Sequence, residues 1–524
     1  MKRKSFFPFF ILLLGALSRL IALGSVPGGM HQDEALTAWN AFALFHEGMD
    51  SAGNHFPIYV AGWGDGQSAM ATWITAPFLL FSGGHITPLL ARIPQAVLSV
   101  FTLWVVYCLM KRLFDAKAGL WSLFLLAICP WHIMMSRWGL DANFAPGFLM
   151  FGLYFFIRGL EQEKFLPISA LFYGLSLYCY AVIWPIVPLM LALQIIYGLY
   201  HKKLRINRWS LLSCLLLFVL ALPLILFVVI NSFDLPPISL LFITIPRMSG
   251  FRGSEIAWSL SGMLSNLRNS LSLLWRQNTG NPYDFLLPWG LFYDIGRIFI
   301  VIGIFALLKN MFMKFRSKTF APEFFLFAQL VGGGLVCLLV TAKQHQINAL
   351  YIPLVLSEAY GVWVVTEFVL RKKELMGNIL IYGLSAIYLV CLLLFQIDYY
   401  TDYRQLTDAY FAKGLEDCVD FAWEQCQEKG IATITVEKGA QWPRLLLYTE
   451  TLPSEYLASV VYDVAPAPAS FDTKGIHINT RIHYDSITQE SVYIIYFTDV
   501  PVFEKDFTLT RFHDWYVAVP VDSP

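Results

Sequence analysis

Long apolar stretches recur along the first three quarters of the chain, and short polar or basic turns separate them. A membrane-spanning helix needs about 20 consecutive apolar residues, so this pattern predicts a polytopic, mainly α-helical membrane protein. The first stretch resembles a signal peptide, but Arg19 interrupts it and no small-residue cleavage site follows, which favours a retained helix. The eleven predicted spans cover residues 5–24, 87–110, 118–135, 143–160, 165–181, 183–200, 209–231, 286–308, 321–341, 347–369 and 376–397.

Basic residues gather in five of the turns between these spans. Cytoplasmic turns of membrane proteins carry the excess of Lys and Arg. An even number of predicted spans separates each cluster from the next, which places all five on the cytoplasmic side with the N-terminus. The clusters are Lys2/Arg3/Lys4, Lys111/Arg112/Lys117, Lys202/Lys203/Arg205/Arg208, Lys309/Lys314/Arg316/Lys318 and Arg371/Lys372/Lys373.

Three larger pieces then fall on the extracytoplasmic side: a first loop (25–86), a middle loop (232–285) and a C-terminal tail (398–524). The tail combines a helical stretch, Tyr403 to Lys429, with short β-rich runs such as Thr433–Val436. We therefore predict a transmembrane domain over 1–397 and a small extracytoplasmic α/β domain over 398–524, in a multi-pass protein of the cell membrane.

Composition agrees with a membrane protein and excludes one class of partner. The chain is 57% hydrophobic and 14% charged, whereas soluble domains carry about 25% charged residues. Residues 1–397 hold 28 Lys and Arg against 17 Asp and Glu, and residues 398–524 hold 9 against 20. The net charge of zero therefore divides into +11 and −11. Nucleic-acid binding needs a basic surface, which the acidic tail does not offer.

An acidic pair, Asp33-Glu34, follows the first span and the turn Pro27-Gly-Gly. A carboxylate at the start of a helix also stabilises the helix dipole, which is the structural alternative. The pair lies where a span leaves the bilayer, beside the lipid headgroups. There a carboxylate can take a proton from a hydroxyl nucleophile or bind a divalent metal ion, and Glu34 is the candidate metal ligand.

A second short outer loop adds Arg137 and Asp141 at the same face of the membrane. Ionisable residues at span ends are costly to bury and often functional. Their spacing of four residues also suits a simple ion pair within one helix. Both interpretations stay open at this stage.

Four further residues bring positive charge or hydrogen-bonding capacity to the same side: Arg19, Arg92, Lys343 and His345. With Arg137 they are the candidate phosphate ligands, because an arginine fork or a lysine suits a phosphate group, whereas snorkelling of the side chain to the interface is the structural alternative. Carboxylates and cations from spans remote in sequence together predict a site for a phosphate-linked substrate at the membrane surface.

Several nucleotide and hydrolase motifs are missing from the sequence. There is no P-loop, no His-Glu-x-x-His and no Gly-x-Ser-x-Gly. The predicted cytoplasmic turns are too short to fold into a nucleotide-sugar site. The remaining possibility is a sugar donor that is itself embedded in the membrane.

A series of short motifs follows in a fixed order from the first span onward. They are Asp33-Glu34, Phe56-Pro57, Gly64-Asp-Gly-Gln67, Ala91-Arg-Ile-Pro94, Lys111-Arg-Leu-Phe114, Pro130-Trp-His-Ile-Met-Met-Ser-Arg137, Asp141 and the segment from His345 to Pro353. This series resembles the GT-C membrane glycosyltransferases, in particular the protein O-mannosyltransferases and lipid A aminoarabinose transferases. The resemblance is good over residues 10–160, weaker to about residue 370 and absent in the tail.

The resemblance implies a chemistry and assigns roles. The donor would be a polyprenyl-phosphate sugar, and a hexosyl or pentosyl group would pass with inversion to an extracytoplasmic acceptor. Asp33 matches the catalytic base, Glu34 its partner that orients the site or binds metal, and Asp141 the acidic residue of the second outer loop. Arg92 matches an arginine assigned to phosphate. The acceptor (a protein, a lipid or a cell-wall glycan) is not implied.

Three alternatives remain from the sequence. A flippase or transporter of lipid-linked glycans would want ionisable residues deep in the spans and repeat symmetry, and the sequence shows few such residues and no repeat. An oligosaccharide transferase or ligase would use a polyprenyl-diphosphate donor. A non-catalytic protein that binds partners through its tail would leave Asp33 and Asp141 unexplained.

Overall fold

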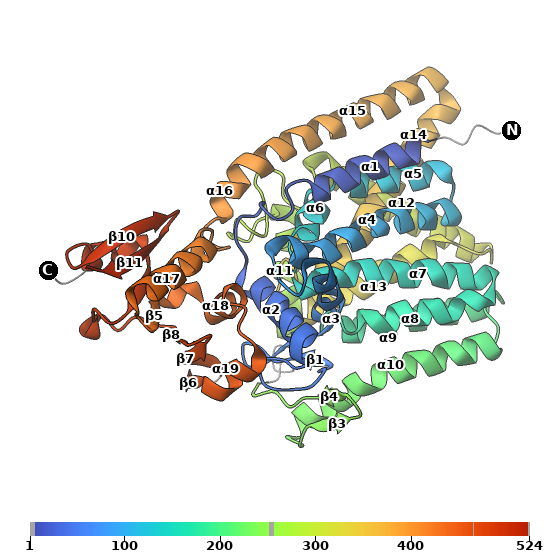
Figure 1. The fold of residues 1–524 in the computed structure, drawn as a ribbon. Coiled ribbons are helices and arrows are strands. Elements are labelled where there is room, and N and C mark those ends of the chain that lie inside the picture. The colour runs from blue at the N-terminus through green and yellow to red at the C-terminus, as the bar shows by residue number, and fades with distance from the viewer. Residues whose placement is uncertain (1–5, 251–255, 465, 522–524) are drawn as a thin grey trace.

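The computed structural model describes residues 6–250, 256–464 and 466–521. A bundle of long helices forms one part of the molecule, and a sheet domain covers one end of it (Figure 1). The bundle helices are α1 (Phe7–Leu20), α4 (Pro88–Leu113), α5 (Ala116–Ile128), α6 (Pro130–Ser136), α7 (Ala145–Glu161), α8 (Leu166–Ser176), α9 (Ile183–Tyr200), α10 (Arg208–Ser232), α12 (Asp294–Arg316), α13 (Glu323–Leu339), α14 (Tyr351–Lys372) and α15 (Glu374–Asp398).

Each predicted span contains at least one of these helices, but the predicted count of eleven is not confirmed. Six helices of the described chain are long and apolar enough to cross a membrane, and a seventh span arises if α5 and α6, bent by 60°, count as one. The others are short: α1 has 14 residues, α7 and α13 have 17 each, and α8 has 11. A straight span needs about 20 residues, which these four do not reach.

Four of the basic clusters lie in turns at the end of the bundle that is remote from the sheet domain (Figure 1). The first cluster, Lys2/Arg3/Lys4, lies outside the described residues. The arrangement separates cationic turns from the sheet domain, as the sequence predicts. Which side of the membrane each end faces stays a prediction.

A layer of loops and short elements lies between the bundle and the sheet domain. Helix α2 begins after a capping box, in which the Glu34 side chain accepts from the His31 backbone N–H and the His31 ring accepts from Asp33. Its residues Ala35 to Leu44 are buried, so this helix is covered on all sides. The layer contains α2 (Gln32–Glu47), β1 (Tyr59–Val60), β2 (Gln67–Ser68), α3 (Met70–Thr75), the 3₁₀ helix η1 (Ala76–Ser82), β3 (Ile238–Leu240), β4 (Ile243–Ile245) and α11 (Leu260–Arg276).

The tail folds into a seven-stranded sheet with the order β10-β11-β9-β5-β8-β7-β6. Strand β5 pairs in parallel with β8 and β9, and the remaining pairs are antiparallel. The elements are α16 (Arg404–Thr407), α17 (Leu415–Lys429), β5 (Thr433–Val436), α18 (Trp442–Tyr448), α19 (Pro453–Ser459), β6 (Val461–Val464), β7 (Ala467–Thr473), β8 (Ile476–Asn479), β9 (Val492–Tyr496), α20 (Val500–Phe503), β10 (Phe507–Phe512) and β11 (Trp515–Pro520). The helical stretch predicted from Tyr403 to Lys429 breaks before Gly414, whose φ of 86° only glycine adopts easily.

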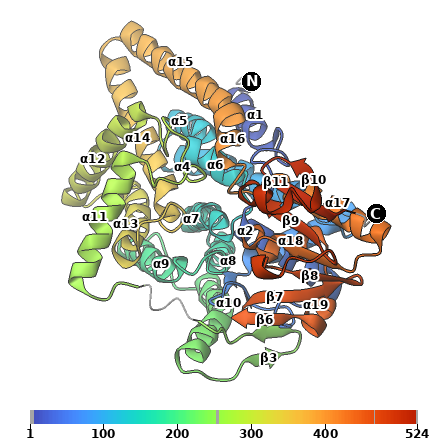
Figure 2. The same cartoon turned by 90° about the vertical axis from the view of Figure 1, so that its left-hand side faces the viewer.

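The sheet domain lies over α2 (Figure 2) and shares its hydrophobic core with the first loop. Trp39 and Phe42 of α2 belong to the same buried cluster as Leu446 of α18 and Phe471 of β7. The Trp39 indole also donates to the Thr451 carbonyl at 2.9 Å. The division at residue 398 therefore marks a change of architecture along the chain, while the two parts pack as one body at this face.

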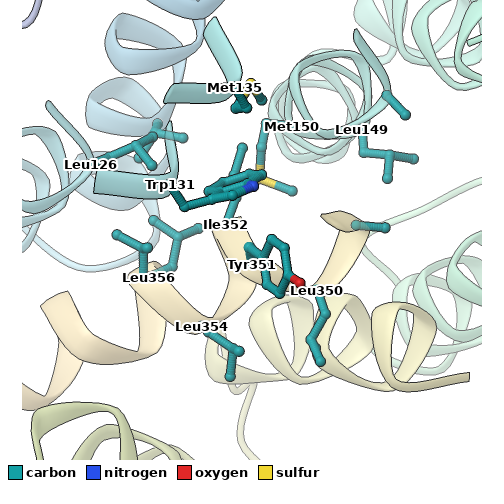
Figure 3. Close-up of a cluster of buried hydrophobic side chains, with 14 of the residues drawn as sticks. Leu126, Trp131, Met135, Leu149, Met150, Leu350, Tyr351, Ile352, Leu354 and Leu356 are labelled. Carbon is teal, nitrogen blue, oxygen red and sulfur yellow. The ribbon is translucent and has the colours of Figure 1, made fainter. Parts of the chain in front are cut away.

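A second cluster fills the bundle beneath the bend between α5 and α6. Trp131 of α6 packs edge-on against Tyr351 of α14, with 4.9 Å between ring centroids. Figure 3 shows Leu126, Met135 and Ile352 around this pair. The cluster fixes α6, and with it the loop that carries Asp141.

Candidate active site

The acidic pair divides into one buried and one accessible carboxylate. The Glu34 side chain is fully buried, whereas the Asp33 side chain keeps 30% of its surface exposed. Glu34 forms a bidentate ion pair with Arg92 at 2.8 and 2.9 Å, and it also accepts from the Gly139 backbone N–H at 2.9 Å. Glu34 therefore joins three segments, and Asp33 is the carboxylate that can meet a substrate.

Arg92, in the first part of α4, is fully buried and uses its whole guanidinium on protein acceptors. Besides Glu34 it donates to the carbonyls of Leu23 at 3.2 Å, Pro27 at 2.8 Å and Gly29 at 2.7 Å. A guanidinium has five N–H donors, and these contacts account for all five. The side chain holds the turn before α2 in one conformation.

Arg19 and Arg137 each donate to carbonyls at the end of a helix other than their own. Arg19, near the end of α1, donates to Leu126 at 3.1 Å and Ala127 at 2.9 Å, the last carbonyls of α5. Arg137, at the end of α6, donates to the Arg19 and Ile21 carbonyls at 3.1 and 2.8 Å, where α1 ends. The last carbonyls of a helix lack helical partners, so Arg19 of α1 stabilises the end of α5, and Arg137 stabilises the end of α1.

These contacts change the roles that the sequence predicts for the three arginines. Arg19, Arg92 and Arg137 are predicted to bind phosphate, but all three are buried and engage backbone carbonyls or Glu34. A phosphate would have to displace several hydrogen bonds at each, which leaves buried carbonyls without partners at about 1–3 kcal/mol each. We reassign the three as positioning residues.

Asp141 lies across a short strand from Asp33. Its carboxylate, 6% exposed, accepts from the backbone N–H of Ser68 at 3.2 Å and of Ala142 at 2.7 Å. Gln67, the residue before Ser68, donates its side-chain amide to the backbone carbonyl of Asp33 at 3.4 Å. Consecutive residues of β2 thus contact the Asp33 backbone and the Asp141 carboxylate, so one strand connects two acidic residues that are 108 positions apart.

The wall beside Asp33 is formed by aromatic residues and a histidine. The His31 ring lies 5.0 Å from Trp138, 5.5 Å from Tyr283 and 5.7 Å from Phe411, measured between centroids. Burial, together with the charges of Arg444 and His345, lowers the pKa of His31 to about 3. His31 is therefore neutral at physiological pH and serves as a hydrogen-bonding wall rather than a cation.

Arg444 of α18 also reaches the site, although nothing in the sequence indicates it. It is 4% exposed and donates to the carbonyls of Met30 at 2.8 Å and Tyr410 at 2.8 Å. Burial lowers its pKa, and the charges of Asp33 and Glu34 act in the opposite direction. The sheet domain therefore contributes a cation next to the acidic pair. No motif in the tail points to it.

The late segment around His345 reaches the same place from the other side. Asn348 donates its amide to the Ala142 carbonyl at 2.8 Å, which ties this segment to the Asp141 loop. The His345 ring faces Tyr180 with 6.2 Å between centroids. Lys343 is exposed, and within the described residues its ammonium group has no hydrogen bond or ion pair. Of the predicted phosphate ligands, Lys343 is the one that offers a free charge.

A cavity of about 600 Å³ opens beside this segment. Val340 and Gln346 line it, and Lys343 lies in the turn between them. Its remaining wall is largely aromatic and apolar, with Tyr59, Tyr180, Trp184, Phe227 and Trp258 among the lining residues. Asp65 and Asn231 add polar groups to the lining, and the rest of the cavity suits an apolar chain.

The residues present do not fit a bound metal ion at Glu34. Both carboxylate oxygens of Glu34 already accept from Arg92, one of them also from Gly139, and a cation would have to displace the guanidinium. Within the described ranges no three His, Cys, Asp or Glu side chains group as metal ligands. No step of the sugar transfer is therefore assigned to a metal ion.

The fold is that of known membrane glycosyltransferases. The chain superposes on ArnT from Cupriavidus metallidurans in the apo state with a TM-score of 0.56, 12% identity and 97% coverage of both chains. The same enzyme bound to undecaprenyl phosphate gives 0.54, 12% identity and 98% coverage of both. An Archaeoglobus fulgidus oligosaccharyltransferase tethered to an acceptor peptide gives 0.50 and 14% identity, over 85% of this chain and 63% of that one.

A family model agrees with this fold. Residues 67–227 match the model described as dolichyl-phosphate-mannose-protein mannosyltransferase. No curated protein matches the sequence significantly. The shared fold and the family model over residues 67–227 confirm the predicted resemblance to the GT-C membrane glycosyltransferases of the ArnT and protein mannosyltransferase kind.

Proposed function

We propose that the protein transfers a sugar from a polyprenyl-phosphate donor to a hydroxyl acceptor on the extracytoplasmic side, with inversion at the anomeric carbon. The observation that carries the proposal is the partly exposed carboxylate of Asp33, connected through β2 to Asp141, with a cavity and the exposed Lys343 on the neighbouring segment. The ArnT structure with undecaprenyl phosphate supports the choice of lipid, because the two chains share their fold along 98% of their length.

The reaction is a single displacement. Asp33 takes the proton of the acceptor hydroxyl, and the oxygen attacks the anomeric carbon from the face opposite the phosphate. The bond from this carbon to the phosphate oxygen breaks, and polyprenyl phosphate leaves with the electron pair. Lys343 stabilises the departing anion, and the prenyl chain occupies the apolar cavity. Asp141 and Gln67 fix the distance between β2 and the base.

An oligosaccharide donor is the second candidate. The fold similarity to the Archaeoglobus fulgidus oligosaccharyltransferase favours it, although this chain spans only 63% of that protein. The two candidates differ in the number of sugar residues that arrive on the acceptor in one turnover, which the mass of the product reports.

The test is transfer in proteoliposomes that contain the full-length protein. Radiolabelled polyprenyl-phosphate sugars are supplied with a membrane and cell-envelope extract, and new labelled products are separated by size and solubility. Label that enters a new product only when active protein is present supports the transferase and identifies sugar and acceptor together. Movement of labelled lipid between leaflets without a new product would instead identify a flippase.

Asp141→Asn is expected to lower the turnover by about 100-fold, because small displacements of a reacting group have effects of this size. The carboxylate accepts two backbone N–H groups, and an amide offers one of its two positions as a donor. The initial rate of label transfer measures the effect. Unchanged turnover would mean that the β2 contact does not position the site.

Addition of a chelator is expected to leave the transfer rate unchanged. Glu34 is occupied by Arg92 and Gly139 and is not free to bind a cation. The rate is measured after dialysis against EDTA and again after Mg²⁺ or Mn²⁺ is restored. A loss that either ion reverses would show that a metal takes part after all.

A further inference from the structure

A second cavity lies at the other end of the bundle, remote from the acidic pair. It has a volume of about 390 Å³ and lies between the C-terminal end of α9, the C-terminal end of α12 and the start of α13. Tyr197, Tyr200 and Phe315 form much of its wall, and His201 and Lys318 stand at its edge. We call it the basic cavity.

Two cation-rich turns meet around the basic cavity. The turn after α9 contributes Lys203, whose ammonium group lies 5.7 Å above the ring of Phe320. That ring in turn lies 5.5 Å from Tyr197, a wall residue. The turn after α12 contributes Lys318 directly. Residues that are more than 100 positions apart therefore place positive charge over one opening.

The positive charge at this opening is not neutralised by nearby acids. Glu323, at the start of α13, is buried and accepts from Lys314 at 2.8 and 2.9 Å, so its charge is already matched. In the parts of the chain that the structure describes, neither Lys203 nor Lys318 takes part in an ion pair. A ligand with negative charge would find both ammonium groups available.

The walls of the basic cavity are largely apolar and aromatic, which favours a ligand with an apolar part. Ile196 lines the basic cavity and is 66% exposed on the surface of α9, a helix that is apolar enough to span a membrane. Tyr200, also in the wall, is 71% exposed. Aromatic side chains of this kind sit at the level of lipid headgroups. The opening is therefore continuous with a surface that lipid chains cover.

We infer that the basic cavity binds an anionic phospholipid, with its phosphate between Lys203 and Lys318 and an acyl chain along Ile196. Basic pockets between transmembrane helices bind anionic headgroups in this way. The positive-inside rule alone would call for lysines in these turns, but not for an aromatic cavity beneath them. The ligand is distinct from the glycosyl donor, because the site lies at the opposite end of the bundle.

The experiment is native mass spectrometry of the full-length protein, extracted from nanodiscs that contain phosphatidylglycerol and phosphatidylcholine in equal amounts. Wild-type protein is expected to retain phosphatidylglycerol in preference to phosphatidylcholine. The double variant Lys203→Glu, Lys318→Glu should retain it at least fivefold less for each lysine, roughly the effect of one cation near the surface. The matched control is Lys372→Glu, Lys373→Glu, which changes the same charge at another basic turn and should behave as wild type.

Ile196→Trp provides a test that leaves every charge in place. The larger side chain fills part of the cavity, so phosphatidylglycerol retention should fall here too, while tryptophan fluorescence reports that the fold is intact. Equal retention of the two lipids by wild type, an equal loss in the control, or unchanged retention in Ile196→Trp would each overturn the proposal. Displacement of the lipid by millimolar inorganic phosphate would show that free phosphate is the ligand and would overturn it as well.

Discussion

Asp33→Asn will abolish sugar transfer and leave the folded protein intact. General-base catalysis contributes about 10²–10⁴-fold to a rate, and an amide cannot take the proton of the acceptor. The Asp33 side chain is 30% exposed at the start of α2, and asparagine has nearly the same volume, so the exchange does not disturb the packing of this helix. The substitution should therefore lower the rate by that factor while the melting temperature stays within the error of wild type.

The matched control for this variant is Asp294→Asn. Asp294 begins α12 and is a carboxylate with 78% exposure that pairs with Arg297. The same chemical change there should leave transfer unaffected. If Asp33→Asn retained near-wild-type turnover, the base would have to be sought elsewhere at the site, with Asp141 as the first candidate.

Arg92→Ala will lower the free energy of unfolding by about 3–5 kcal/mol, the range for removal of one partner from a buried ion pair. The substitution leaves the Glu34 carboxylate buried without its cation, and it removes the donors to three backbone carbonyls. The effect is measured as a shift of the thermal transition of the detergent-solubilised protein. Transfer should fall as well, because the turn before Asp33 loses its support.

Two further variants show whether Arg92 supports the fold or binds phosphate. Arg112→Ala, on the same helix, removes a partly exposed ion pair with Glu161 and should cost less than about 1 kcal/mol. Arg92→Lys should lie between wild type and Arg92→Ala in stability, since an ammonium group keeps a positive charge for Glu34 but has three donors in place of five. A stable Arg92→Lys protein with weakened donor binding would restore the phosphate interpretation.

The apolar pattern predicts the helices of the bundle well, and the reason is physical. Every helix that crosses lipid must satisfy its own backbone and must be apolar over most of its surface, so the signal is local. The pattern fails for α8, where the apolar run continues past the last helical residue, Ser176, into a loop that is buried by its neighbours. Burial inside the protein and exposure to lipid favour the same apolar residue types, so the pattern does not distinguish a buried loop from a lipid-facing helix.

The site is predicted less completely than the fold. Asp33, Asp141 and the segment at His345 carry local signals, and the structure brings them together around β2. The arginines do not reveal their partners, because a backbone carbonyl leaves no trace in the sequence. An arginine at a span end looks the same whether it binds phosphate or, like Arg137, caps another helix.

The position of Arg444 at the site could not be predicted, for a different reason. This residue belongs to a tail that the sequence motifs do not reach, and its approach to Met30 depends on how the sheet domain docks. Such a contact follows from tertiary packing between segments that are 414 positions apart. Only the three-dimensional arrangement shows it.

The turn before the acidic pair is held by residues that follow the last helix of the bundle. The backbone N–H of Met30 donates to the Phe411 carbonyl at 2.7 Å, and its carbonyl accepts from Arg444. Both partners lie beyond α15, so a chain cut after α15 keeps every bundle helix but loses both bonds. The conformation of this turn therefore depends on the folding of the tail as well as on Arg92. Detachment of the tail would release the turn without unfolding the bundle.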